Sequence, residues 1–195
     1  MLRAFIAIEI PLEIKKAIAA QTASLQKETG HAVRWVTLDN IHLTLKFLGE
    51  ISPSSVELLS QSLQLECSQY APFEIAVSSL GCFPSPRRPR VIWIGLHAPA
   101  ELTQLQHKIE TTVARLGYDM QDKPFSPHLT IGRVREQISA DESLHLRAAL
   151  ESKIIDDLGS FSVRAIHLFK SDLQSSGSVY TSLYSGDLGS YYAEI

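Results

Sequence analysis

Two four-residue segments, His42-Leu43-Thr44-Leu45 and His128-Leu129-Thr130-Ile131, carry the same His-x-Thr-x pattern. They begin 86 positions apart (128 − 42) in a chain of 195 residues. Each segment opens a stretch in which polar and apolar residues alternate, which is the period of a strand with one buried face. A motif that recurs at such an interval points to a duplicated structural unit.

The spacing around the two motifs repeats as well. Ile8 precedes His42 by 34 positions (42 − 8), and Ile94 precedes His128 by the same 34 (128 − 94). The offset drifts to 87 for one later pair and 88 for another, which are Ser52 with Ser139 and Phe73 with Phe161. We therefore predict an α+β protein made of two β-α-β-β-α-β-like units, with two antiparallel sheets facing each other and helices packed outside.

Local patterns predict the elements of each unit. Ile6, Ile8 and Ile10 alternate with Phe5, Ala7 and Glu9, which is typical of a half-buried strand. The predicted strands are Arg3–Ile10, Val33–Thr37, Ile41–Leu48, Phe73–Leu80, 91–96, a strand from His128, Phe161–Leu173 and Val179–Leu188. The predicted helices follow Pro11 as far as Gly30, follow Ser52, follow Pro99 as far as Gly117, and follow a capping box at Ser139 and Glu142.

The composition is that of an ordinary globular protein. Hydrophobic residues make up 45% of the chain and the net charge is −3, so any contact with nucleic acid has to be local. Cys67 and Cys82 are expected to be buried free thiols in a reducing compartment. The first ten residues resemble neither a secretory leader nor a membrane span, so we expect a cytoplasmic protein with no membrane contact.

Each His-x-Thr-x motif presents one imidazole and one hydroxyl on the same face of its strand. His42 and Thr44 share a face, as do His128 and Thr130, with Cα atoms roughly 6.6 Å apart in each pair. In-line displacement at phosphorus needs a proton acceptor and a proton donor on opposite sides, and two imidazoles can fill both roles near neutral pH. The hydroxyls can bind the non-bridging phosphate oxygens, which predicts a phosphoesterase site.

Other readings of the motifs are weaker. One His-Leu-Thr triplet could arise by chance as an ordinary strand segment, but two copies at equivalent positions of a repeat are far less expected. Neither motif has a second His, Asp, Glu or Cys at ligand spacing, so we expect no metal site and no cofactor. The sequence also contains no Gly-x-Ser-x-Gly elbow and no phosphate-binding Gly-x-x-x-x-Gly-Lys-Ser/Thr loop.

At these residues the chain resembles the two-histidine (2H) phosphoesterase superfamily. Within it, the chain is most similar to the RNA 2′,3′-cyclic phosphodiesterases, also called 2′-5′ RNA ligase-like proteins. The resemblance covers nearly the whole chain. The segments that carry it are Arg3-Ala4-Phe5-Ile6-Ala7-Ile8, Val33-Arg34-Trp35-Val36, His42-Leu43-Thr44-Leu45-Lys46-Phe47-Leu48-Gly49-Glu50, Pro89-Arg90-Val91-Ile92-Trp93 and Phe125-Ser126-Pro127-His128-Leu129-Thr130-Ile131-Gly132-Arg133.

The resemblance implies a bilobal fold with a central cleft and a specific reaction. We expect one domain over residues 1–195, with repeat 1 at about 1–85 and repeat 2 at about 86–195. The implied reaction is metal-independent hydrolysis of an RNA terminal 2′,3′-cyclic phosphate to a 2′-phosphate, together with reversible 2′-5′ RNA ligation, in which the 5′-hydroxyl of another RNA replaces water. By resemblance, His42 is the proton donor and His128 the proton acceptor. The symmetry of the two motifs alone could not assign these roles.

Several other residues have two open readings. Arg133 could bind phosphate or form a surface salt bridge, and strict alternation turns it away from His128 unless a bulge intervenes at Gly132. The basic segment 85–90 could guide RNA or be a solvated loop between the repeats. Lys46 could reach the cleft or face solvent. Phe5 and Trp35 could stack on a base or pack in the core.

The expected partners are RNA ends, including tRNA fragments, or nucleotides with a cyclic phosphate, and we expect a monomer. Two alternatives stay open. One is another two-histidine activity, on ADP-ribose cyclic phosphate or 2′-5′-linked oligoadenylate. The other is a noncatalytic module that binds RNA ends. The remaining histidines are assigned no role, and these are His31, His97, His107, His145 and His167.

Overall fold

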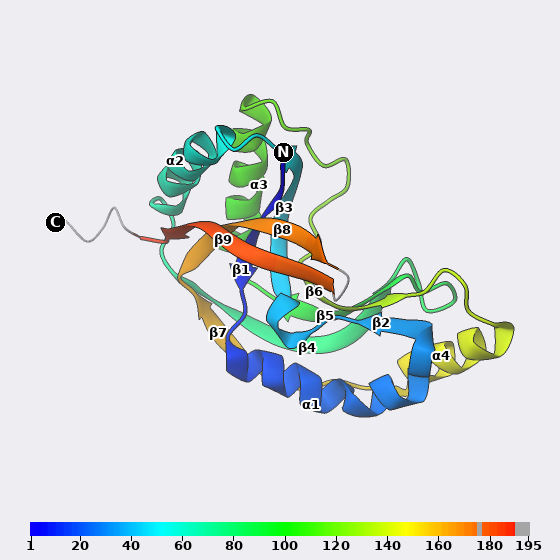
Figure 1. Cartoon of the computed structure of the whole chain (residues 1–195). Helices are drawn as coiled ribbons and strands as arrows, with labels where there is room; N and C mark the ends of the chain where they lie inside the picture. Colours follow the sequence, from blue (N-terminus) through cyan, green and yellow to red (C-terminus); the bar gives the residue numbers. More distant parts are fainter. Residues whose placement is uncertain (175–176, 190–195) are drawn as a thin grey trace.

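The computed structural model of the protein describes residues 1–174 and 177–189. This part of the chain contains four α-helices, nine β-strands and two short 3₁₀ segments, at Gly30–Ala32 and Leu38–Asn40 (Figure 1). In chain order the elements are β1 (Leu2–Glu9), α1 (Leu12–Thr29), β2 (Val33–Trp35), β3 (His42–Ile51), α2 (Ser55–Cys67), β4 (Phe73–Phe83), β5 (Val91–His97), α3 (Ala100–Arg115), β6 (His128–Val134), α4 (Ala140–Ser152), β7 (Asp157–Val163), β8 (Ala165–Gln174) and β9 (Gly177–Asp187).

All strand pairs described are antiparallel, and the strand order is β7-β4-β5-β6-β3-β1-β8-β9, with β2 added beside β6. The predicted α+β class is confirmed. The two expected sheets are the halves β7-β4-β5-β6 and β3-β1-β8-β9, and they meet at one residue pair, Leu43 opposite Leu129. They thus form one curled sheet, with α1 and α4 packed together on one side and α2 and α3 on another (Figure 1).

The registers within the two halves follow the offset of 86. The equivalent pairs are Ile8–Leu43 with Ile94–Leu129, Ala7–Thr44 with Trp93–Thr130, and Ala7–His167 with Trp93–Gly81. The third set shows that β4 and β8 are exchanged between the two halves of the sheet. β4 comes from the first half of the sequence but pairs with β5 of the second, and β8 comes from the second half but pairs with β1 of the first. The duplication and its boundary near residue 85 stay predictions, and these matching registers support them.

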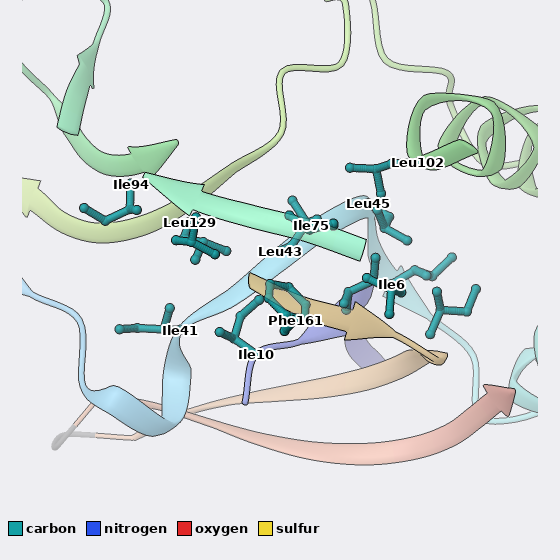
Figure 2. Packing of buried hydrophobic residues seen from close by; sticks show 14 of the residues in the cluster. Ile6, Ile10, Ile41, Leu43, Leu45, Ile75, Ile94, Leu102, Leu129 and Phe161 are labelled. Atoms are coloured by element: carbon teal, nitrogen blue, oxygen red, sulfur yellow. The ribbon is translucent and has the colours of Figure 1, made fainter. Parts of the chain in front are cut away.

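The apolar core lies between the sheet and the helices, and Leu43 and Leu129 sit within it (Figure 2). Their neighbours His42, Thr44, His128 and Thr130 lie on the opposite face of the strands, because side chains alternate. The capping box is confirmed, since Ser139 Oγ accepts from Glu142 N at 3.1 Å and Glu142 Oε2 accepts from Ser139 N at 2.7 Å. None of the helices in the described ranges is both long and apolar enough to span a membrane.

Three sequence predictions differ from the structure. β1 is buried on both faces from Ala4 to Ile8, because an aromatic cluster covers the face that was expected to meet solvent. The single strand predicted at Phe161–Leu173 is two strands, β7 and β8, which separate at Arg164. Cys67 is buried, and burial raises the pKa of its thiol to about 12, whereas Cys82 is only partly buried.

Candidate active site

Both His-x-Thr-x motifs line one cleft with a volume of about 1590 Å³. Antiparallel pairing of Leu43 with Leu129 sets His42 level with Thr130, and Thr44 level with His128, across the join between β3 and β6. The two imidazoles and two hydroxyls therefore alternate around one small area of the cleft wall. The four motif side chains thus lie together as expected, and their roles in catalysis and binding stay predictions.

The two histidines are oriented by equivalent hydrogen bonds. His42 Nδ1 lies 2.8 Å from the carbonyl oxygen of Asn40, and His128 Nδ1 lies 2.7 Å from that of Ser126. A carbonyl oxygen can only accept, so Nδ1 carries the hydrogen in both rings and Nε2 is left to act on a ligand. In both motifs the imidazole bonds to the carbonyl group two residues earlier in the chain, and this bond gives each ring a fixed tautomer and a fixed orientation.

His42 lies in an apolar setting. Its ring centroid is 4.7 Å from that of Phe5 and 5.2 Å from that of Tyr180. Burial is the largest effect and lowers the pKa of His42 from 6.5 to about 4, aided by the positive charges of Lys15 and Arg133 and opposed by the hydrogen bond to Asn40. His42 is therefore neutral near pH 7 until a ligand brings negative charge beside it.

This lowered pKa predicts how stability depends on pH. Because the folded protein holds His42 neutral and the unfolded chain protonates it near pH 6.5, its contribution is present above pH 6.5 and is lost as pH falls toward 4. Between about pH 7.5 and about pH 4.5, we expect wild type to lose on the order of 2 to 3 kcal/mol more unfolding free energy than His42→Asn. Urea unfolding of both proteins measures this, and equal acid sensitivity would contradict the burial of a neutral ring.

Arg133 lies on the cleft wall because β6 contains a bulge. Ile92 pairs with Gly132 but Trp93 pairs with Thr130, so Ile131 is the extra residue. One extra residue reverses the alternation, and Arg133 consequently lines the same cleft as His128. The structure thus meets the condition under which the sequence placed Arg133 near the phosphate.

The cleft is more basic than the chain as a whole. Five basic side chains line it, against two acidic ones; these are Arg3, Lys15, Arg34, Lys123 and Arg133, with Glu9 and Asp39. The arginines of segment 85–90 and the five histidines outside the motifs are not part of the lining. Within residues 1–174 and 177–189, no group of three His, Cys, Asp or Glu side chains is placed to hold a metal ion.

A family model for LigT-like phosphoesterases matches the chain twice, over residues 8–93 and 94–180. The chain belongs to this family. Its relatives include the RNA 2′,3′-cyclic phosphodiesterase of Methanocaldococcus jannaschii, 34% identical over 179 residues, or 92% of this chain and 96% of the relative. The Escherichia coli protein of the same name is 35% identical over 133 residues, or 67% of this chain and 71% of that protein.

Solved structures agree with this membership. The crystal structure of TT0787 from Thermus thermophilus matches with a TM-score of 0.79 and 25% identity, covering 96% of this chain and 98% of that one. E. coli LigT in complex with 3′-AMP matches with a TM-score of 0.72 and 28% identity, over the same shares. The curled sheet is thus the LigT-like fold.

The two aromatic candidates occupy different surroundings in this LigT-like phosphoesterase. Phe5 also lines the cleft, but it is only 3% exposed and packs against His42, Phe169 and Tyr180, which favours the packing reading. Trp35 is half-buried and lines the cleft, and its indole Nε1 has no hydrogen-bond partner in the described part of the chain. A role for either ring in binding substrate stays a prediction.

Sequence reasoning missed Phe47, which is 58% exposed and lines the cleft. In β1 and β3, Ile6 pairs with Lys46 but Ala7 pairs with Thr44, so Leu45 is the extra residue of a bulge equivalent to that in β6. The offset of 86 makes Phe47 the counterpart of Arg133, and this relation could have been found from the repeat. Phe47 offers an open aromatic face for a nucleobase.

Both readings of Lys46 were wrong, because the bulge at Leu45 turns its side chain into the core. Lys46 is 1% exposed, and its Nζ donates to Glu110 Oε1 and to the carbonyl oxygen of Asp119. Glu110 Oε1 also accepts from Gln121 N at 2.7 Å. This buried ion pair ties β3 and α3 to the segment that leads to His128.

Proposed function

We propose that this protein hydrolyses the 2′,3′-cyclic phosphate at an RNA end to a 2′-phosphate, using His42 and His128 and no metal ion. The observation that carries the proposal is the pair of equivalent imidazoles, each fixed through Nδ1 with Nε2 free, beside two threonines in one basic cleft. Relatives named RNA 2′,3′-cyclic phosphodiesterase, such as that of M. jannaschii, support the choice of substrate.

The proposed reaction is a single in-line displacement. His128 Nε2 takes a proton from water as the water oxygen bonds to phosphorus, the bond from phosphorus to O3′ breaks, and His42 Nε2 gives a proton to O3′. The anionic phosphate raises the pKa of the buried His42 when it binds, so the acid acquires its proton in the complex. The same displacement with the 5′-hydroxyl of a second RNA in place of water breaks the same P–O3′ bond and gives 2′-5′ ligation.

Thr44 and Thr130 hold the non-bridging oxygens in this proposal, and Arg133 adds a charged donor. We expect Thr44→Ala and Thr130→Ala each to lower kcat/KM by roughly 10- to 100-fold, because each loses one hydrogen bond to a charged oxygen. Steady-state kinetics on a short RNA with a cyclic phosphate end measure the loss. A threonine variant that loses more activity than either histidine variant would overturn the assignment.

The substrate class is tested by comparing the turnover of an RNA cyclic phosphate with that of related phosphate compounds. With excess EDTA present, turnover of a short RNA ending in a 2′,3′-cyclic phosphate is compared with ADP-ribose cyclic phosphate and 2′-5′-linked oligoadenylate. The proposal expects the RNA to have the highest kcat/KM and EDTA to leave it unchanged. Faster turnover of one of the other two compounds would show that this compound, and not RNA, is the substrate. RNA binding without any turnover would indicate a noncatalytic binding module.

The proposal also includes the wider setting of the reaction. A monomer acts in the cytoplasm on RNA ends, tRNA fragments among them. Sedimentation at working concentration tests the monomer, and sequencing of cyclic-phosphate ends that accumulate when the protein is removed from its cells tests the substrate. A dimer, or an unchanged set of ends, would contradict these parts.

A further inference from the structure

The two ends of the cleft are related by the repeat but differ in chemistry. On β3, Phe47 lies two residues after the extra residue of the bulge, and its counterpart at the same place on β6 is Arg133. The counterpart of Arg34, by the same offset, is Met120, which belongs to no strand. One end of the site therefore presents an aromatic ring, and the other presents two guanidinium groups.

The two arginines are held directly opposite each other. β2 pairs with β6 in a register that sets Arg34 against Arg133, and both exposed side chains line the cleft. Directly opposed residues have Cβ atoms about 5 Å apart, and like charges at this separation destabilise a sheet. Among residues 1–174 and 177–189, no carboxylate forms an ion pair with either arginine. The pair is suited to an external anion.

The close approach of β2 to β6 depends on Gly132. A Cβ atom at this position would lie 2.8 Å from Val33 Cγ1 and 3.2 Å from the ring of Trp35. Glycine thus allows β2 to lie close beside β6 at the point where Arg34 pairs with Arg133. Arg133 lies on β6 itself, the strand of the second motif, and its positive charge acts on His42, whereas Arg34 lies on the separate strand β2, which carries neither motif.

We propose that Arg34 binds the phosphodiester that joins the terminal nucleotide to the one before it, while Arg133 reaches the reacting phosphate. This inference rests on the proposed function. It makes the site selective for oligonucleotides over mononucleotide cyclic phosphates, since a mononucleotide has no second phosphate for Arg34. The phosphate contact is a charge-assisted hydrogen bond, which an arginine can make through two N–H groups at once.

The test uses a dinucleotide that ends in a 2′,3′-cyclic phosphate and a matched dinucleotide with a neutral methylphosphonate at the internal linkage. For wild type we expect kcat/KM to be about 10-fold higher with the charged linkage. In Arg34→Gln this preference disappears, because the partner of the charge is gone. The matched control is Arg115→Gln, which removes an exposed arginine at the end of α3, outside the cleft, and keeps the preference.

Each other outcome overturns the inference. If Arg34→Gln slows both dinucleotides equally, Arg34 acts on the reacting phosphate instead. If it slows neither, Arg34 has no part in binding. If wild type hydrolyses the cyclic phosphates of both dinucleotides at one rate, no subsite for the internal phosphate exists. Failure of wild type to hydrolyse any cyclic phosphate is a separate result, and that result refutes the proposed function.

Discussion

Replacing His42 or His128 by alanine is expected to lower the rate of cyclic phosphate hydrolysis by roughly 100- to 10,000-fold in each case. Within the described part of the chain, these two rings are the only imidazoles that line the cleft, and each is fixed through Nδ1 for action at Nε2. The hydroxyl groups of the neighbouring threonines do not ionise near neutral pH, so they cannot replace an imidazole as acid or base. The measurement is kcat under saturating RNA, together with far-ultraviolet circular dichroism to confirm that the variants fold.

The control for these variants removes an imidazole from elsewhere in the fold. His107 is exposed on α3 and does not line the cleft, so His107→Ala should keep the wild-type rate. Retention of most activity in either motif variant, while His107→Ala behaves like wild type, would show that the paired imidazoles are structural residues of the strands.

Replacing Lys46 by methionine is expected to lower the free energy of unfolding by about 3 to 5 kcal/mol. The change leaves Glu110 as an uncompensated charge in the core, where it is 5% exposed. Gln106 Nε2 donates to Glu110 Oε2 at 3.3 Å, but this neutral amide cannot replace an ammonium group. Urea unfolding of wild type and Lys46→Met gives the difference, and Lys108→Met at an exposed site of α3 should show little change.

A double variant separates the ion pair from simple loss of packing. Lys46→Met with Glu110→Leu removes both charges, and apolar replacement of a whole buried pair is often neutral or stabilising. We therefore expect the double variant to recover most of the stability that Lys46→Met loses. A double variant no more stable than the single one would mean that the charges themselves contribute little. Because the pair anchors the segment before His128, Lys46→Met should also lower activity.

The spacing that the two halves share was predictable because its signal is periodic. The offset of 86 between the motifs reappears in the strand registers, and alternation correctly set His42 with Thr44 and His128 with Thr130. These features depend on local spacing, which a single sequence contains. The α+β class followed from the same patterns.

Bulges and strand exchange could not be predicted in the same way. A bulge is defined by which residue lies opposite on the next strand, so the sequence of β3 alone does not reveal that Leu45 is extra. This is why Lys46 was assigned to the wrong face and why Phe47 was missed. The exchange of β4 and β8 between the halves likewise depends on pairing between distant segments. For Arg133, the sequence showed only that its side chain would need a bulge at Gly132 to reach the same face as His128.

The position of the product phosphate tests the central proposal most directly. The protein is incubated in excess EDTA with a short RNA that ends in a 2′,3′-cyclic phosphate, and the product is compared with 2′-phosphate and 3′-phosphate standards. We predict a 2′-phosphate as the sole product, formed by wild type and nearly absent with His42→Ala and His128→Ala. A 3′-phosphate, or a reaction that requires a metal ion or survives in both histidine variants, would contradict the two-histidine mechanism.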